Sequence, residues 1–227
     1  MLVGSGLLSS VFNEYASDEN VVIFASGVSN SSQTDENEFL REQELVEKTI
    51  DENLEKKFIY FSSCALVDDT NYETPYYLHK KRMEVIIQSL APSYLIIRLP
   101  QVFGEIKEHV TLINFLCMKV LKGEMFEVWA GASRYVIHID DVLILVRSFI
   151  ENKLEHKIIN VANTYRYTLF ELIEYIEKKV DRKARFIVLD KQDSYELEFR
   201  FLQDYIKKNN LKFSFGKSYF FEKLKVH

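Results

Sequence analysis

A tyrosine and a lysine at helical spacing, Tyr76 and Lys80, are the residues of this sequence best suited to proton transfer. A tyrosine alone is a poor acid or base near neutral pH, because the ordinary pKa of its phenol is about 10. An ammonium group one helical turn away favours the phenolate and lowers that pKa. On one helix face, the pair could therefore exchange a proton with a substrate hydroxyl or carbonyl.

The same Tyr-x-x-x-Lys spacing recurs three times, and each recurrence taken alone is typical of a solvated helix face. The recurrences are Tyr77/Lys81, Tyr175/Lys179 and Tyr219/Lys223. Tyr76/Lys80 differs because Pro75 suits the first turn of a helix and Glu84 follows one turn later. Ser62 and Ser63 also end the apolar run that precedes it. These neighbours select Tyr76/Lys80 as the candidate catalytic pair.

Alternating strands and helices are expected to position this pair. Apolar runs predict strands that start near residues 21, 58 and 94, and the run at 94–99 is typical of a strand buried on both faces. Shorter strands are predicted at 126–129, 134–139 and 159–163. Amphipathic patterns predict helices over 36–53, 75–91, 109–122 and 168–179, and a further helix that begins at Asp141. Asp140 would cap the helix that begins at Asp141, and Thr168 and Glu171 would form a capping box at the start of the last helix.

The first 16 residues predict a very short strand, a glycine turn and an amphipathic helix that ends near Ala16. Gly4 and Gly6 could place the start of this helix against a pyrophosphate, and a plain strand-to-helix turn is the alternative. Ser9 stands where a third glycine of that pattern would lie. The tail over 192–227 is aromatic and charged, and it could close over the core or pack on a second subunit.

The composition is that of an ordinary globular chain of 227 residues, with 47% hydrophobic and 28% charged residues. A net charge of −5 argues against a nucleic-acid surface, which needs a basic patch. Cys64 and Cys117 lack metal-ligand spacing and predict reduced thiols, and no metal site is expected. No signal peptide and no membrane-spanning run is visible, so the chain is predicted to be cytoplasmic.

Several stretches together resemble the extended short-chain dehydrogenase/reductase family, which includes the nucleotide-sugar epimerases, dehydratases and reductases. The resemblance covers about residues 1 to 190. It rests on FIYFSSCALVDDTNYETPYYLHK at 58–80, VVIFASGV at 21–28, YLIIRLPQVFG at 94–104, SRYVIHIDDV at 133–142 and INVAN at 159–163. The resemblance implies an α/β fold, with a Rossmann-like parallel sheet flanked by helices and a small C-terminal substrate lobe.

By this resemblance, the chain is expected to lack the second and third strands of that fold. In the family, an acidic residue at the end of the second strand holds the adenosine ribose. Here Asp18 and Glu19 precede the next strand, which is similar to the family's fourth strand. The expected organisation is a shortened Rossmann-like core over 1–105 and a mixed region over 106–227, of which about 133–163 would complete the core.

The resemblance implies roles for individual residues. Tyr76 would be the acid/base, Lys80 would lower its pKa and hold the nicotinamide ribose, and Ser63 would contact the substrate, with Cys64 as a rival for that role. The other cofactor-binding candidates are Gly4, Gly6, Ala25, Ser26 and Gly27. The other substrate-binding candidates are Gln101, Asn114 and Arg134, although Asn114 could instead be a capping or core residue and Arg134 part of a surface ion pair.

The main hypothesis is an enzyme that uses NAD or NADP to reduce, epimerise or dehydrate a nucleotide sugar, in surface polysaccharide synthesis. A non-catalytic relative that binds a nucleotide sugar or a partner enzyme is the second hypothesis, because the adenosine-side strands are missing. A third is a subunit whose partner completes the cofactor site. The sequence leaves open whether the chain forms a homodimer.

Overall fold

The computed structural model describes residues 1–67, 74–105 and 111–226, and the chain divides into two compact units. The first unit consists of Met1–Leu99 and Val142–Val161. The second consists of Pro100–Asp141 and Ala162–His227. The segment that returns to the first unit is Val142–Val161.

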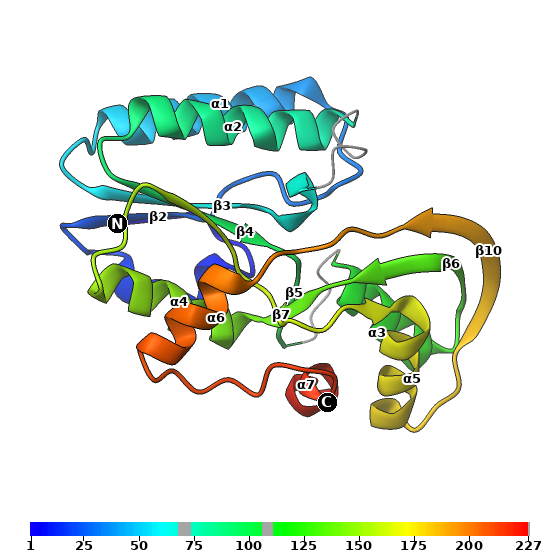
Figure 1. Ribbon diagram of the computed structural model, residues 1–227. Coiled ribbons are helices and arrows are strands. Elements are labelled where there is room, and N and C mark those ends of the chain that lie inside the picture. The colour runs from blue at the N-terminus through cyan, green and yellow to red at the C-terminus, as the bar shows by residue number, and fades with distance from the viewer. Residues whose placement is uncertain (68–73, 106–110, 227) are drawn as a thin grey trace. The chain divides into compact units, whose positions relative to one another are not determined.

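Five parallel strands form the sheet of the first unit in the order β1-β2-β3-β4-β8 (Figure 1). They are β1 (Leu2–Val3), β2 (Val21–Phe24), β3 (Lys57–Ser63), β4 (Tyr94–Leu99) and β8 (Lys157–Asn160). The predicted Rossmann-like α/β fold is confirmed. It is shortened, because β1 lies at the edge of the sheet and no strand of the described residues lies beyond it.

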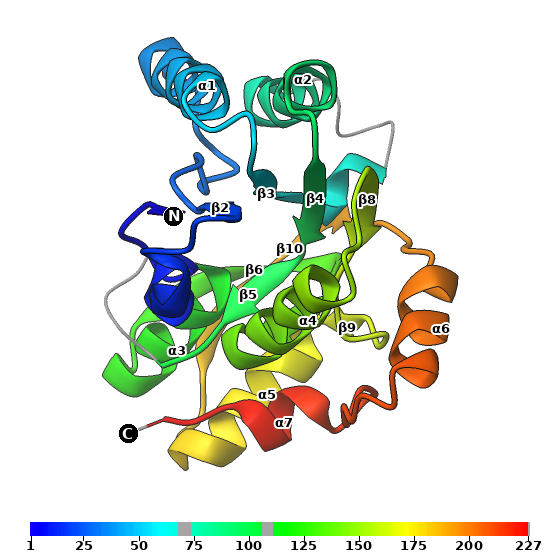
Figure 2. The same ribbon diagram turned by 90° about the vertical axis from the view of Figure 1, so that its left-hand side faces the viewer.

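Helices cover both faces of this sheet (Figures 1 and 2). On one face lie α1 (Glu36–Asp51) and α2 (Pro75–Leu90), which contact each other. On the other face lie α4 (Ile139–Glu151) and two 3-10 turns, η1 (Ser9–Val11) and η2 (Asn13–Tyr15). The guanidinium of Arg147 on α4 donates to both carboxylate oxygens of Glu14 on η2, at 2.6 and 2.8 Å.

The prediction of an amphipathic helix up to Ala16 was wrong, because this segment forms two 3-10 turns of three residues each. Short polar side chains here donate to backbone carbonyls three residues earlier. Ser9 donates to Gly6 at 2.7 Å and Ser10 donates to Leu7 at 2.7 Å. Such local bonds compete with α-helical pairing, so the segment closes in short turns.

The second unit contains a three-stranded sheet in the order β10-β6-β9 and a two-stranded sheet formed by β5 and β7. Its strands are β5 (Gln101–Phe103), β6 (Met125–Arg134), β7 (Val136–His138), β9 (Tyr167–Thr168) and β10 (Arg185–Asp193). The helices α3 (Leu112–Lys122) and α5 (Leu169–Val180) pack together, and α5 also contacts β6. The predicted capping box of α5 is present.

Several boundaries in and after this region differ from the prediction. The strand expected at 126–129 is part of the longer β6, which runs from Met125 to Arg134. The strand expected at 134–139 is the shorter β7, Val136–His138. Asp140 lies inside the first turn of α4, which begins at Ile139, so it does not cap that helix. The late strand is β8, which ends at Asn160. The structure describes α3 from Leu112 onward, and residues 109 and 110 of the predicted helix lie outside the described part.

The C-terminal tail closes the core of the second unit. It contains α6 (Arg200–Lys208) and α7 (Tyr219–Lys223), and Tyr219, Phe220 and Leu224 are among the buried core residues. Asn163 clamps the tail, since its amide donates to the Gly216 carbonyl at 3.0 Å and accepts the Gly216 N–H at 2.7 Å.

Among the described residues, no helix has both the length and the apolar character to cross a bilayer.

Candidate functional site

Helix α2 carries Tyr76, Lys80 and Glu84 at successive turns, and the structure buries all three side chains. Their exposed fractions are 7%, 2% and 3%. Pro75 occupies the first turn of the helix, where its missing N–H costs no helical hydrogen bond. The predicted candidate pair therefore lies on one buried helix face.

The ammonium of Lys80 is bound by a neighbouring helix and a neighbouring strand. It donates to the Glu42 carboxylate on α1 at 3.0 Å and to the Tyr60 hydroxyl on β3 at 2.9 Å. Tyr60 in turn donates to the same Glu42 oxygen at 2.5 Å. Lys80, Tyr60 and Glu42 thus form a closed triangle of hydrogen bonds beneath α1 and α2.

The second oxygen of Glu42 is also fully engaged. It accepts the backbone N–H of Val28 at 2.6 Å and lies 3.0 Å from the His79 ring nitrogen. Burial alone would raise the pKa of this carboxyl group, but the Lys80 charge and the three hydrogen bonds outweigh it and hold the pKa at about 2. Glu42 is therefore a buried carboxylate that stays ionised.

Gly27 lies against this ion pair. A Cβ atom at position 27 would lie 2.7 Å from the Lys80 nitrogen and 2.8 Å from a Glu42 oxygen. Every residue other than glycine would therefore push Lys80 or Glu42 aside. The loop after β2 is thus in direct contact with the charge cluster through the glycine and through the Val28 N–H.

A second buried ion pair holds α2 against β4. Both oxygens of Glu84 accept from the Arg98 guanidinium, at 2.9 and 2.7 Å. The Ser62 hydroxyl donates to the same carboxylate at 2.6 Å. Ser62 therefore has a structural partner.

The phenol of Tyr76 is not bound to Lys80 in this structure. Burial raises the pKa of Tyr76 well above its usual range, and the Tyr77 phenol and the Glu42 carboxylate add to the rise. The ring of Tyr77 contacts it edge-on, with centroids 5.1 Å apart. The direction of this shift is opposite to the one expected from a tyrosine whose phenolate an ammonium group stabilises.

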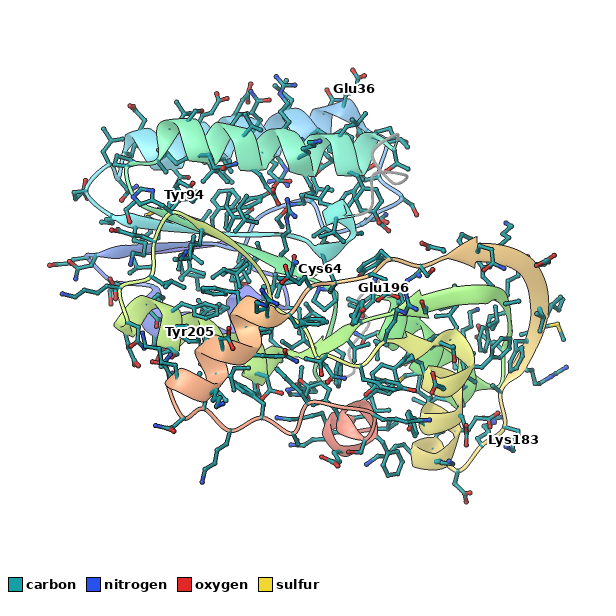
Figure 3. All side chains as sticks on the ribbon, viewed as in Figure 1. Glu36, Cys64, Tyr94, Lys183, Glu196 and Tyr205 are labelled. Carbon is teal, nitrogen blue, oxygen red and sulfur yellow. The ribbon has the colours of Figure 1, made fainter. Side chains whose placement is uncertain are left out.

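The two candidates for the substrate hydroxyl role differ in exposure. Ser63 is half-buried at the end of β3, and its hydroxyl accepts the Ala65 N–H at 3.3 Å. Cys64, labelled in Figure 3, is fully buried and its thiol donates to the Arg98 carbonyl at 3.0 Å. Burial raises the pKa of the Cys64 thiol far above its usual range.

The glycine candidates follow β1, beside the end of β2. Gly4 has a φ of +129°, and a Cβ atom there would lie 2.5 Å from the Ala25 carbonyl oxygen. A glycine is therefore required where the two chain segments meet. A Cβ atom at Gly6 would meet no atom within 4 Å, so a side chain there would have open space. Ser26 accepts the Arg41 guanidinium with its carbonyl at 3.4 Å.

The remaining candidates lie in the second unit. Gln101 is half-buried on β5, and its backbone N–H donates to Tyr135 at 3.2 Å. Asn114 is buried on α3, with its backbone N–H capped by the Thr111 hydroxyl. The guanidinium of Arg134 pairs with the Asp193 carboxylate and donates to the Asp193 carbonyl at 2.8 Å.

Sequence reasoning missed Glu42 and Tyr60. A signal for Glu42 was present, since it lies four and eight residues before Val46 and Ile50 on the buried face of α1. A charged residue at such a position needs a buried partner. Tyr60 gave no signal, because an aromatic residue in an apolar strand is ordinary.

The described residues contain no group of three side chains suited to hold a metal ion.

No family model and no curated protein matches the chain. Solved structures match it over nearly its whole length. UDP-glucose 4-epimerase from Thermus thermophilus, in complex with NAD, is 14% identical, with a TM-score of 0.70 over 95% of this chain and 81% of that one. GDP-mannoheptose C4 reductase from Campylobacter jejuni, with NADP bound, is 12% identical, with a TM-score of 0.68 over 95% and 84%.

A third match is dTDP-glucose 4,6-dehydratase from Bacillus anthracis, in complex with NAD. It is 11% identical, with a TM-score of 0.69 over 96% of this chain and 75% of that one. At these identities the likeness establishes the fold. The chain has the fold of NAD-dependent epimerases, dehydratases and reductases in a shorter form, as the sequence resemblance predicted.

Proposed function

We propose that the chain is an NAD(P)-dependent enzyme that reduces, epimerises or dehydrates a nucleotide sugar, with a role in surface polysaccharide synthesis. The observation that carries this proposal is that Tyr76 and Lys80 share one buried face of α2, and that Lys80 bonds to Tyr60 on β3, the strand that ends at Ser63. The fold supports the same class of reaction, because the matched solved structures include a 4-epimerase, a C4 reductase and a 4,6-dehydratase of nucleotide sugars.

The residues near the ends of β1 and β2 fit part of a dinucleotide. The Cβ position of Gly6 faces open space, and the glycine at position 4 lets the first turn approach β2 closely. The residues that would hold the dinucleotide are Gly4, Gly6, Ala25, Ser26, Gly27, Tyr76 and Lys80. The adenosine half has less support, because Asp18 instead caps the start of β2 by accepting the N–H groups of Asn20 and Val21.

When bound, the dinucleotide would supply hydride transfer. The chain's own contribution is proton transfer and positioning. Tyr76 would give a proton to, or take one from, a sugar oxygen, and the Ser63 hydroxyl would hold that oxygen in place. Ser63 is preferred over Cys64, whose buried thiol already donates to a carbonyl. Gln101, Asn114 and Arg134 stay candidates for substrate contacts.

A second candidate function is a non-catalytic protein that binds a nucleotide sugar or a partner enzyme. A specific observation favours it. Lys80, which should serve a cofactor ribose and the Tyr76 phenol, is bound by Glu42 and Tyr60 and is almost fully buried. In this reading, Lys80 stabilises the packing of α1 and α2 and no turnover occurs.

Turnover of a panel of nucleotide sugars with NAD(H) or NADP(H) separates the two functions. We expect Tyr76→Phe to abolish turnover and to leave nucleotide-sugar binding intact, because the substitution removes only the phenolic oxygen. The matched control is Tyr175→Phe, which alters another Tyr-x-x-x-Lys pair and should leave both unchanged. Full turnover by Tyr76→Phe, or its loss in Tyr175→Phe, would contradict the assignment of the acid/base.

A further inference from the structure

The cluster around Glu42 joins α1 and α2 to β3 and to the loop after β2 through a buried charge. Its carboxylate is completely buried and has four partners: the Lys80 ammonium, the Tyr60 hydroxyl, the His79 ring and the Val28 N–H. A carboxylate has about four acceptor positions, so that of Glu42 is saturated. Such a group holds its partners firmly, because none of them can leave without exposing a buried charge.

Glu42 also acts on Tyr76 without touching it. The negative charge of Glu42 is one of the causes that raise the pKa of Tyr76, and the Glu42 carboxylate binds the Lys80 ammonium, which lies on the same helix face as Tyr76. The ionisable groups that face this region are Glu42 from α1, Tyr60 from β3, and Tyr77, His79, Lys80 and Glu84 from α2. Of these groups, Glu42 both raises the pKa of Tyr76 by its negative charge and binds the Lys80 ammonium.

We propose that Glu42 is a positioning residue that withholds Lys80 from Tyr76, so that the Glu42–Lys80 ion pair must open before Tyr76 can ionise. With the pair closed, Tyr76 keeps its proton and the site is inactive. With the pair open, the ammonium group becomes available to the phenolate and to a ligand hydroxyl. This inference rests on the proposed acid/base role of Tyr76.

The loop after β2 provides a route by which a ligand could open the pair. Val28 donates its N–H to Glu42, and a Cβ atom added at Gly27 would lie 2.7 Å from the Lys80 nitrogen and 2.8 Å from a Glu42 oxygen, so the loop adjoins the ion pair. Parallel α/β sheets bind ligands at the carboxyl ends of their strands, which is where this loop lies. A ligand that displaces residues 26–28 would weaken the hold of Glu42 on Lys80.

Glu42→Gln tests the proposal without any ligand. The substitution keeps the shape of the side chain and removes its charge. Tyrosinate absorbance at 295 nm is measured against pH in the wild type and in Glu42→Gln, each minus the same protein carrying Tyr76→Phe. The difference isolates Tyr76 from the other 12 of the 13 tyrosines.

The wild-type difference should stay near zero through the pH range in which an ordinary tyrosine ionises, because the Tyr76 pKa is raised. In Glu42→Gln, the midpoint of Tyr76 ionisation should fall by about one pH unit or more, which is the size of effect expected from one nearby charge and its counter-ion. Glu38→Gln alters an exposed glutamate of the same helix and should leave the midpoint unchanged. Glu42→Asp keeps the charge and should keep the midpoint high.

An unchanged midpoint in Glu42→Gln would overturn the proposal. If that variant does not fold, Gly27→Ala serves instead, because its Cβ atom would push Lys80 away from Glu42 and should also lower the midpoint. An unchanged midpoint in Gly27→Ala would then overturn the proposal. These readouts need no turnover, so a failure of the proposed function would show separately as absent dinucleotide binding.

Discussion

The ionised state of Glu42 predicts a specific dependence of stability on pH. Its pKa in the folded protein is about 2, against an ordinary value of 4.5. A depressed pKa stabilises the folded state above the ordinary value, and the stabilisation is lost as the pH falls toward the folded value. A difference of about 2.5 pKa units corresponds to about 3 kcal/mol at neutral pH, and about 2 kcal/mol of this should disappear between pH 6 and pH 3.

Urea unfolding at a series of pH values measures this contribution. The free energy of unfolding of the wild type should fall between pH 6 and pH 3 by about 2 kcal/mol more than that of Glu42→Gln, which has no carboxyl group to protonate. Other carboxyl groups titrate in both proteins, so the comparison cancels them. Equal slopes in the two proteins would refute the conclusion that Lys80 and its neighbours hold Glu42 ionised.

Two further predictions concern the glycine turn and the C-terminal tail. Gly4→Ala should lower the free energy of unfolding by about 1 to 3 kcal/mol, since position 4 has a positive φ and its Cβ would strike the Ala25 carbonyl, whereas Gly6→Ala, with open space, should change it little. Urea titration of both variants decides this, and equal losses would contradict it. Asn163→Ala should cost about 1 to 3 kcal/mol by leaving the half-buried Gly216 N–H without this partner, although the Gly216 carbonyl keeps the Tyr167 hydroxyl. An unchanged melting temperature would show that the clamp is dispensable.

Much of the fold could be predicted from local sequence signals. The strand at Tyr94–Leu99 has the predicted bounds, because its apolar residues, interrupted by Arg98 alone, favour a buried place in a parallel sheet. Helix α5 was predicted because its capping box, Thr168 and Glu171, lies within four residues. The shortened sheet was predicted because Asp18 and Glu19 precede the next strand, whereas an acidic residue that binds an adenosine ribose follows its strand.

The parts that sequence reasoning missed depend on competition or on distance. Residues 9–15 have a helical pattern, but side-chain bonds to nearby carbonyls favour 3-10 turns. The Glu42–Lys80 pair joins residues 38 positions apart, and no local pattern reports such a contact. For this reason the spacing of Tyr76 and Lys80 predicted a partnership, whereas the fold gives Lys80 to Glu42 and Tyr60.

Calorimetric titration of the wild-type protein with NAD(H) and NADP(H), with and without a mixture of nucleotide sugars, tests the proposed function most directly. The account predicts that one of the dinucleotides binds with micromolar affinity, despite the shortened adenosine side. Binding of a nucleotide sugar with no binding of either dinucleotide would contradict the enzyme proposal and would favour the non-catalytic function.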